Sequence, residues 1–191
     1  MVKKQGAILR REFFGRPTLT VAKALLGKYL VRHAGDRVLA GRIVEVEAYV
    51  GPHDLACHAS KGRTPRTDVM FGPAGVAYVY LIYGMYHCLN VVTEREGYPA
   101  AVLIRGIEQG EVIDGPGRVC RLLQIDRTLN RLDLTLGQHL WIEDRGDRVS
   151  RSAITAAPRI GVDYAGEWAL KPWRFSLARP RGSADRASGA R

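Results

Sequence analysis

The sequence predicts an α+β fold in a single domain, and three observations support this expectation. The chain has 191 residues and a hydrophobic content of 46%, which is enough to bury one core without metal ions or disulfides. Runs of alternating apolar residues follow one another across short turns, as in β-hairpins. Helical spacing with capping residues is confined to short segments. We expect the domain to occupy residues 1–177 and a basic, disordered tail to occupy residues 178–191.

Two short helices are expected, over residues 17–27 and 118–123. In the first, a threonine hydroxyl provides the cap, apolar residues recur at helical spacing, and Gly27 provides the stop. The second helix is opened by the segment Gly115-Pro116-Gly117, since proline is favoured at the first helical position. We expect the first helix to pack on a sheet.

The other regular segments are predicted to be strands because they alternate and are bounded by turn residues. Their ranges are residues 29–32, 38–50, 100–105, 134–136, 140–143 and 172–177, with a hairpin over residues 78–93. Alternation within residues 38–50 predicts two faces. The apolar face carries Val44, Val46, Ala48 and Val50, and the other carries Ile43, Glu45, Glu47 and Tyr49. Residues 51–75 are rich in glycine, proline, arginine and histidine, which predicts a long loop that holds functional groups.

The predicted hairpin is rich in aromatic side chains. Residues 78–89 hold four tyrosines and a methionine around Gly84. Stiff apolar rings at a bend are suited to insertion between stacked bases. A buried strand shows the same alternation, so this alternative stays open for Tyr78 and Tyr80. The residues that flank the bend, and for which insertion is favoured, are Tyr83, Met85 and Tyr86.

Charge and composition narrow the class of partner. Lysine and arginine total 29 against 19 acidic residues, and the formal charge of +10 indicates a polyanionic partner, most simply nucleic acid. An anionic membrane surface is the competing partner, but the longest apolar stretch, residues 76–83, is too short to span a bilayer. Charges at residues 10–12 interrupt any secretory signal, and three cysteines without paired spacing suit reduced thiols. We therefore expect an intracellular protein.

Two carboxylates, Glu45 and Glu47, share a strand face with Tyr49. A carboxylate that faces an aromatic pocket can act as a general base, because burial adjusts its pKa and hydrogen bonds aim it at a water molecule. The alternative is a pair of surface carboxylates that form ion pairs with arginines. Arg105 ends an apolar run and needs a partner, for which this carboxylate face is the first candidate.

The loop after these carboxylates contains further polar candidates. His53, Asp54, Cys57 and His58 are all competent metal ligands. No second cluster with ligand spacing follows, so we expect neither a metal nor a cofactor and favour a histidine that positions a ligand. The segment Arg63–Asp68 offers donors suited to phosphates, with solvated charge as the alternative. Asn90 is either a satisfied partner within the sheet or a discriminator in a pocket.

Several segments taken together match one protein family in order. They are residues 41–49, His58 with residues 63–66, residues 78–86 with Asn90, residues 159–162, residues 165–168 and Pro172. From about Glu12 to Leu177 the chain thus resembles the alkyladenine (3-methyladenine, methylpurine) DNA glycosylases, with His87 as a departure where a hydrophobic residue is commoner. The resemblance implies a curved antiparallel sheet with surrounding helices and a protruding hairpin that enters the minor groove, while the damaged nucleotide flips into a pocket.

The resemblance also implies a role for individual residues. Glu47 is similar to the base that deprotonates the attacking water, with support from Glu45. Arg105 and the backbone carbonyl of Ile160 then help to hold that water. The implied base pocket consists of Tyr49 and Tyr80 stacked on the two faces of the base, His58 and the carbonyl of Ala56 at its purine edge, and Asn90 excluding guanine. The implied DNA contacts are Tyr83 as the wedge, Met85 beside it, and Arg63 and Tyr86 on phosphates.

The function that the resemblance implies is a monofunctional DNA glycosylase of base excision repair. Such an enzyme flips alkylated or deaminated purines out of double-stranded DNA and hydrolyses the N-glycosidic bond, which leaves an abasic site. We expect no lyase step, no obligate protein partner, a monomer, and a place in the bacterial cytoplasm with the nucleoid. Two alternatives stay open: a non-catalytic binder of damaged or distorted duplex DNA, and a metal hydrolase built on His53, Cys57 and His58.

Overall fold

The computed structural model describes residues 6–178, which form one antiparallel sheet of ten strands. The main path runs in the order β1-β8-β2-β3-β6-β5-β4, while β10 pairs with β3 and β9, and β7 pairs with β6. The strands are β1 (Ala7–Ile8), β2 (Tyr29–Ala34), β3 (Arg37–Tyr49), β4 (Ala77–Ile82), β5 (Tyr86–Val92), β6 (Ala101–Gln109), β7 (Glu111–Asp114), β8 (Leu140–Asp144), β9 (Ile154–Ala157) and β10 (Arg174–Leu177).

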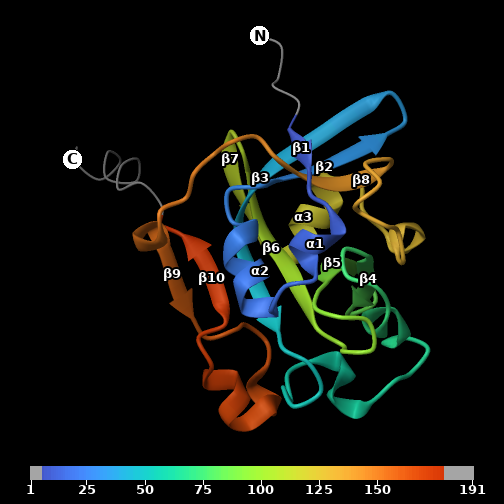
Figure 1. The fold of residues 1–191 in the computed structure, drawn as a ribbon, viewed down its shortest axis with the longest axis vertical. Coiled ribbons are helices and arrows are strands. Elements are labelled where there is room, and N and C mark those ends of the chain that lie inside the picture. The colour runs from blue at the N-terminus through green and yellow to red at the C-terminus, as the bar shows by residue number, and fades with distance from the viewer. Residues whose placement is uncertain (1–5, 179–191) are drawn as a thin grey trace, which may run out of the picture.

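The long strand β3 organises this sheet (Figure 1). Its first part pairs with β2, and its second part pairs with β6 on one edge and with β10 on the other. Because β2 and β10 pair with successive parts of β3 on the same edge, the sheet branches and curls. The curled antiparallel sheet and the single domain confirm the predicted fold class.

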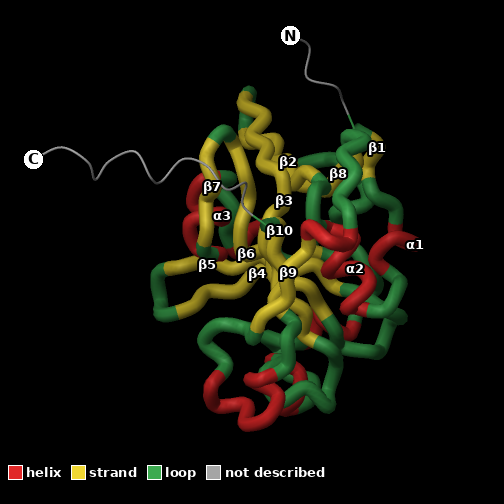
Figure 2. The backbone as a smooth tube through the Cα atoms, turned by 90° about the vertical axis from the view of Figure 1, so that its left-hand side faces the viewer, coloured by secondary structure: helices red, strands yellow, loops and turns green. Residues whose placement is uncertain are grey.

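The helices are short. They are α1 (Arg11–Phe14), α2 (Thr18–Leu25) and α3 (Pro116–Leu122), with 3-10 segments η1 (His58–Lys61), η2 (Asp68–Phe71), η3 (Arg127–Leu129), η4 (Arg151–Ala153) and η5 (Asp163–Leu170), the last kinked at Gly166. Leu25 of α2 and Val119 of α3 belong to one buried cluster with Val46 of β3 and Ile104 of β6. The curl therefore wraps one face of the sheet around both helices and leaves the other face free for a site. Figure 2 shows the β4–β5 hairpin projecting from the side of the molecule.

The two predicted helices are confirmed, but the cap of the first is not the one expected. Helix α2 begins after Pro17, and the Thr18 hydroxyl donates to Glu94 at 2.6 Å instead of capping the helix. Gly27 follows the helix at φ +84°, a conformation that glycine adopts without steric cost. The predicted stop is thus correct, while the hydroxyl cap was wrong because a tertiary partner takes the threonine.

Most of the predicted strands and the tyrosine hairpin are confirmed, and one strand was wrong. Residues 134–136 form a turn in which the Asp133 carboxylate accepts the amide of Thr135 at 2.9 Å and its hydroxyl at 2.6 Å. An aspartate that bonds the backbone two residues ahead favours a turn over a strand. Leu134 is nevertheless fully buried, so its apolar character reflects a core position in a turn.

A β-bulge changes the predicted faces of β3. The register shifts between Ile43 and Glu45 and again before Val46, and an extra residue of this kind moves the preceding side chains to the opposite face. Ile43 therefore joins Val46 in the core cluster, and Val44 lies outside it. The assignment of Glu45 and Glu47 to the face opposite Val46 is correct, whereas that of Ile43 and Val44 was wrong.

The predicted loop over residues 51–75 contains two 3-10 segments but no strand among its residues, all of which the structure describes. Of the predicted tail, Ala178 is described and its amide donates to the carbonyl of Ala153 at 2.9 Å, while residues 179–191 lie outside the described residues. No helix within residues 6–178 combines the length and apolarity needed to cross a membrane. Cys57, Cys88 and Cys120 are free and buried within the same range.

Candidate active site

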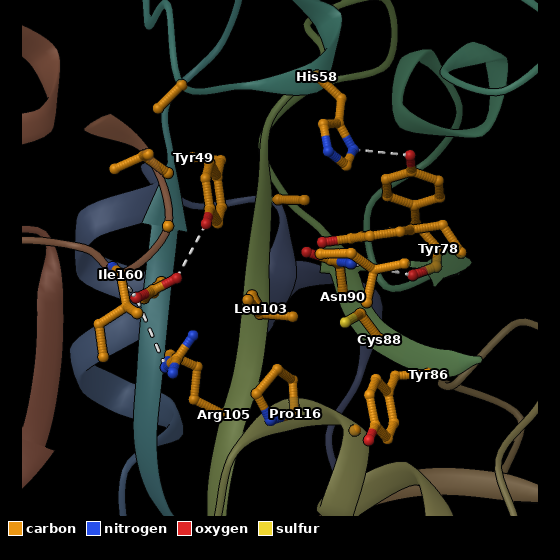
Figure 3. A pocket seen from close by; sticks show the side chains of 18 of the residues that line it. Tyr49, His58, Tyr78, Tyr86, Cys88, Asn90, Leu103, Arg105, Pro116 and Ile160 are labelled. Atoms are coloured by element: carbon orange, nitrogen blue, oxygen red, sulfur yellow. Dashed lines mark hydrogen bonds and ion pairs between the residues drawn. The ribbon is translucent and has the colours of Figure 1, made fainter. Parts of the chain in front are cut away.

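A cavity of about 700 Å³ opens on the face of the sheet opposite α2, and the start of α3, with Pro116, Gly117 and Arg118, forms part of its wall (Figure 3). Alternation along four adjacent strands directs polar and aromatic side chains into it. These are Glu47 and Tyr49 from β3, Leu103 and Arg105 from β6, Cys88 and Asn90 from β5, and Tyr78 and Tyr80 from β4. The register aligns them, because Leu103 pairs with both Glu47 and Asn90, and Asn90 pairs with Tyr78.

The structure brings together most of the residues predicted for the site. Those that line the cavity are Glu47, Tyr49, Ala56, His58, Tyr80, Tyr83, Tyr86, Asn90, Arg105 and Ile160. Met85 and Arg63, both within the described range, lie outside the lining. The surface alternative for Glu47 was wrong, since its side chain is fully buried.

Glu47 is held by three groups inside the cavity. Its Oε1 accepts the backbone amide of Ile160 at 2.8 Å, and its Oε2 accepts the hydroxyl of Tyr49 at 2.9 Å. The Nε of Arg105 lies 3.5 Å from Oε1. Burial raises the pKa of Glu47, and Arg105, the Ile160 amide, Tyr49 and Arg159 oppose that rise. Donors to a carboxylate favour its ionised form, so the site both dehydrates this group and supports its charge.

Arg105 is aligned by a second carboxylate. Its Nε donates to Glu45 Oε1 at 2.9 Å, and Arg174 of β10 approaches the other oxygen of Glu45 at 3.5 Å. The sequence prediction that Arg105 pairs with the carboxylate face of β3 is confirmed. Glu45 thus sits behind Arg105, which is consistent with the predicted supporting place.

Tyr49 is a permanent donor to the carboxylate. Burial and the neighbouring Glu47 charge raise the pKa of Tyr49 well above its ordinary value. The phenol therefore stays protonated at physiological pH and continues to donate its hydrogen bond to the Glu47 carboxylate. With Tyr80, whose pKa burial also raises, it supplies aromatic surface to the cavity.

His58 shares a hydrogen bond of 2.9 Å between Nδ1 and the Tyr78 hydroxyl, and its ring meets the ring of Tyr80 edge to face at 4.7 Å between centroids. Burial and the positive charge of Arg66 lower the pKa of His58 to about 4. The imidazole is therefore neutral at physiological pH, and the cavity gains no positive charge from it.

This neutrality is testable. We expect the His58 ring to titrate near pH 4, whereas an unperturbed histidine titrates at 6.5, and imidazole NMR shifts measured against pH would show it. Because the unfolded chain binds the proton at higher pH than the folded one, the free energy of unfolding should fall as pH drops from 6.5 toward 4. His58→Gln should flatten that part of the stability profile. A midpoint near 6.5 would contradict the lowering of the His58 pKa by burial and by Arg66.

Asn90 is buried, and its Nδ2 donates to the carbonyl of Tyr78 across the strand pair at 3.2 Å. This contact fits the interpretation as a satisfied partner within the sheet. The same side chain also lines the cavity, so a role as discriminator stays a prediction. Tyr78 is 2% exposed and belongs to a buried cluster, so it fits the core interpretation, although its side chain also lines the cavity.

The hairpin tip carries exposed apolar side chains. Tyr83 is 83% exposed, Met85 66% and Tyr86 48%. Tyr83 and Gly84 both have positive φ, 53° and 70°, a pattern typical of the central residues of a type I′ turn. A bulky residue in this conformation is uncommon, so the turn presents Tyr83 outward at some local cost.

The beginning of α3 packs against the β4–β5 hairpin at Tyr86. A Cβ added at Gly117 would lie 3.0 Å from the Cβ of Tyr86, so glycine allows the helix and the hairpin to approach closely. Arg63, by contrast, is paired with Asp68 at 2.6 Å on the surface beyond the cavity lining. Its predicted phosphate contact stays a prediction.

The candidate metal ligands do not converge. Asp54 is buried in an ion pair with Arg159, and the ring of His58 bonds Tyr78. Within residues 6–178 no group of three His, Cys, Asp or Glu side chains is arranged to hold a metal ion. Asp54 and His58 are thus neighbours in the sequence that serve separate contacts.

Sequence reasoning missed two contacts at this site. Arg159 lies in one of the segments that match the family, but no role was predicted for it from the sequence. Its partner Asp54 was considered only as a metal ligand. Tyr164, which had no signal in the sequence, lines the cavity, and its hydroxyl donates to the carbonyl of Ala56 at 3.3 Å. In this structure the carbonyl expected to read a purine edge thus already has a donor.

Comparison with known proteins places this geometry in context. A family model described as "Methylpurine-DNA glycosylase (MPG)" matches residues 12–181. A protein of Myxococcus xanthus (strain DK1622), named "Putative 3-methyladenine DNA glycosylase", is 56% identical over 174 residues that cover 87% of this chain and 88% of that protein. A protein of the same name from Methanocella arvoryzae is 54% identical over 185 residues, 88% of this chain and 91% of that one. One from Legionella pneumophila (strain Corby) is 56% identical over 173 residues, 88% and 93%.

Proposed function

The chain belongs to the methylpurine-DNA glycosylase family, and on that premise we propose that it is a monofunctional DNA glycosylase for alkylated or deaminated purines. The observation that carries this proposal is a fully buried glutamate, Glu47, inside an aromatic cavity next to a hairpin with an exposed tyrosine tip. The enzyme hydrolyses the N-glycosidic bond and leaves an abasic site.

Glu47 acts as the general base that activates a water molecule. A base must reach its proton within about 3 Å and must be ionised at the working pH. The amide of Ile160, the Tyr49 phenol and Arg105 favour the ionised form of Glu47 and fix its orientation. The positive charge of Arg105 also stabilises the negative charge that develops on the attacking water molecule. The backbone carbonyl of Ile160 helps to hold this water molecule.

One carboxylate is sufficient when the leaving group is already activated. Sugar hydrolases generally use an acid and a base together, because the leaving oxygen must be protonated. A purine methylated at N3 or N7 carries a positive charge and departs as a neutral base, so water activation by Glu47 completes the reaction. A neutral base such as hypoxanthine additionally needs a proton donated to its ring as it leaves. His58 is neutral in the cavity and therefore does not repel such a cation.

The cavity receives a base turned out of the duplex. The energy needed to extrude a base is lowest for damaged or mispaired nucleotides, so selection begins before the pocket is filled. Tyr49 and Tyr80 stack on the extruded base, at roughly 1–3 kcal/mol for each stacked base. Asn90 excludes guanine through its exocyclic amine. The edge of the purine meets His58 and the carbonyl of Ala56.

The surface around the cavity engages the duplex. Tyr83 fills the vacated position in the stack with Met85 beside it, while Arg63 and Tyr86 contact phosphates. The formal charge of +10 supports binding to a polyanion, because neutralised phosphates release counterions. The enzyme acts as a monomer and without an obligate protein partner.

The test is base release from defined oligonucleotides. The substrates are duplexes that carry 7-methylguanine, ethenoadenine or hypoxanthine, and the control duplex carries an undamaged purine. We expect release of the damaged bases and no release from the control, detected by mass spectrometry and by alkaline cleavage at the abasic site. Borohydride should trap no covalent adduct, because hydrolysis by water leaves no imine between protein and DNA. Tight binding to lesion duplex without release of any base would instead favour the non-catalytic binder.

A further inference from the structure

Asp54 and Arg159 form a fully buried ion pair next to the Glu47 site, and the function proposed above assigns neither residue a role. Both side chains have 0% exposure, although the residues lie 105 positions apart in the sequence. A buried ion pair is weak support for stability, because desolvation offsets the attraction between the charges. The groups that this pair holds are therefore more informative than the pair itself.

Arg159 bonds three separate segments through its guanidinium. Nη1 donates to the carbonyl of Ala48 at 2.9 Å, and Nη2 donates to Asp54 Oδ1 at 2.8 Å and to the carbonyl of Trp168 at 3.0 Å. The planar fork of arginine suits such divergent acceptors, and lysine cannot reproduce it. The end of β3, the following loop and the segment η5 are thus joined at one point.

Asp54 completes the junction from the loop. Its Oδ2 accepts the amide of Val50 at 3.0 Å, and its Oδ1 accepts the amide of Ala56 at 3.1 Å. Together the two charged residues bind the backbone at Ala48 and at Val50. Tyr49 lies between these positions, so its backbone is fixed on both sides.

The guanidinium of Arg159 also supports the ring of Tyr49 directly. It lies 4.9 Å from the centroid of Tyr49 and 5.1 Å from that of Trp173, distances at which a cation is attracted to an aromatic face. Arg159 is not part of the cavity lining. It therefore backs the tyrosine from behind and leaves the ring accessible to the cavity.

Both hydrogen-bond donors to Glu47 are adjacent to this junction. The phenol of Tyr49 belongs to the residue held between Ala48 and Val50, and the amide of Ile160 belongs to the residue that directly follows Arg159. A displacement of the junction would thus move both donors at once. The ion pair touches neither the cavity nor the carboxylate oxygens, so it acts on Glu47 through these two groups and through the charge of Arg159, which lowers the pKa of Glu47.

We propose that the Asp54–Arg159 pair is a positioning device for the general base, which fixes the Tyr49 hydroxyl and the Ile160 amide on the Glu47 carboxylate. This inference rests on the proposed role of Glu47. The other groups that face Glu47 are Arg105 from β6 and the thiol of Cys88 from β5. They are not bonded to the junction, so changes at the pair leave them in place.

The experiment replaces the pair by apolar residues of similar size. The variant Asp54→Leu/Arg159→Met leaves no unpaired buried charge, and such exchanges are often neutral for stability. The titration of Glu47 is followed by NMR of carboxyl-labelled glutamate and assigned by difference from Glu47→Gln. Loss of well-placed donors and loss of the Arg159 charge both raise the pKa of Glu47, so we expect its midpoint to rise by about one pH unit. The acid limb of the single-turnover rate should move with it, and the rate at neutral pH should fall about 10- to 100-fold.

Two further variants make the result specific. Arg159→Lys keeps the positive charge that acts on Glu47 but loses the fork and the ring contact, so the smaller rise of the Glu47 midpoint expected in this variant reports the positioning of the donors alone. The control Glu143→Leu/Arg145→Met removes another ion pair that is largely buried, joined at 2.6 Å at the end of β8, and should leave the Glu47 midpoint and the rate unchanged. Affinity for undamaged duplex should stay within about twofold in all three, because it does not depend on Tyr49, and the hairpin tip and the arginine proposed to contact phosphates are intact.

The outcomes separate this inference from the proposed function. A double variant with the parental Glu47 midpoint and the parental rate would overturn the positioning role. A lower rate with an unmoved acid limb would also overturn it, since a general loss of folded protein has that effect. If the parental protein releases no base while the Glu47 midpoint still shifts in the variants, the proposed function fails and the positioning role stands.

Discussion

Replacing Glu47 by glutamine is expected to lower the single-turnover rate of base release by about 1,000-fold, because a positioned general base contributes on the order of 10²–10⁴. Glutamine keeps the shape of the side chain, so it still fills the buried site between Tyr49, Ile160 and Arg105. Its carbonyl oxygen can accept the Ile160 amide, and Arg105 keeps Glu45 as a partner at 2.9 Å. Folding and binding to lesion duplex should thus persist while water activation is lost.

The matched control for this prediction is Glu143→Gln. Glu143 is a buried glutamate at the end of β8 with its own arginine and tryptophan partners, so this variant removes a comparable charge outside the cavity. It should release base at the parental rate. The rate is measured with enzyme in excess over a labelled oligonucleotide, and the affinity by anisotropy on the same duplex. Parental release by Glu47→Gln would show that another group activates the water.

The sequence was sufficient to predict those features that depend on local pattern. Strong alternation and a glycine between aromatic residues are local signals, and they predicted the β4–β5 hairpin and its exposed tip. The position of Glu47 on the face opposite Val46 followed from the period of a strand. Partnership between Arg105 and the carboxylate face followed from the cost of burying a charge alone. Each inference needed only the neighbours of a residue and a general energetic rule.

The failures have two different physical causes. The bulge in β3 reverses the faces of Ile43 and Val44 relative to the rest of the strand, and nothing in the alternation marks where the extra residue sits. The turn after Asp133 was predicted as a strand, although the bonds from Thr135 to the Asp133 carboxylate decide its conformation. The bulge depends on pairing between distant strands, whereas the turn depends on a local side-chain bond that the sequence interpretation overlooked.

Contact between segments that are distant in the sequence also explains why the Asp54–Arg159 pair was missed. Asp54 lies among histidines and a cysteine, so its composition suggested metal ligation. The arginine that neutralises it is 105 residues away in the sequence, and no spacing rule connects the two. The sequence thus identified the groups that meet the substrate more readily than those that hold them in place.

Tyr83→Ala is expected to weaken binding to lesion duplex and to lower the duplex excision rate by about 10- to 100-fold, because the side chain no longer fills the vacated stack and extrusion costs a few kcal/mol. The fold should be unaffected. Tyr83 is 83% exposed, so little buried surface is lost, and alanine faces the same steric cost at φ 53° that tyrosine already bears. Val38→Ala, which truncates another exposed apolar residue at 60% exposure, serves as the control and should bind and excise like the parent.

A single-stranded substrate distinguishes a wedge from a general contact. An unpaired base has no partner strand to be separated from, so the advantage that Tyr83 provides in duplex should largely disappear there. The Tyr83→Ala variant should therefore excise a lesion from single-stranded DNA at nearly the parental rate while it remains slow on duplex. Equal losses on both substrates would mean that Tyr83 contacts the bound nucleotide itself, and unchanged duplex affinity would remove the hairpin tip from the flipping mechanism. Either result would leave the Glu47 chemistry intact, because the hairpin tip and the carboxylate are held by separate contacts.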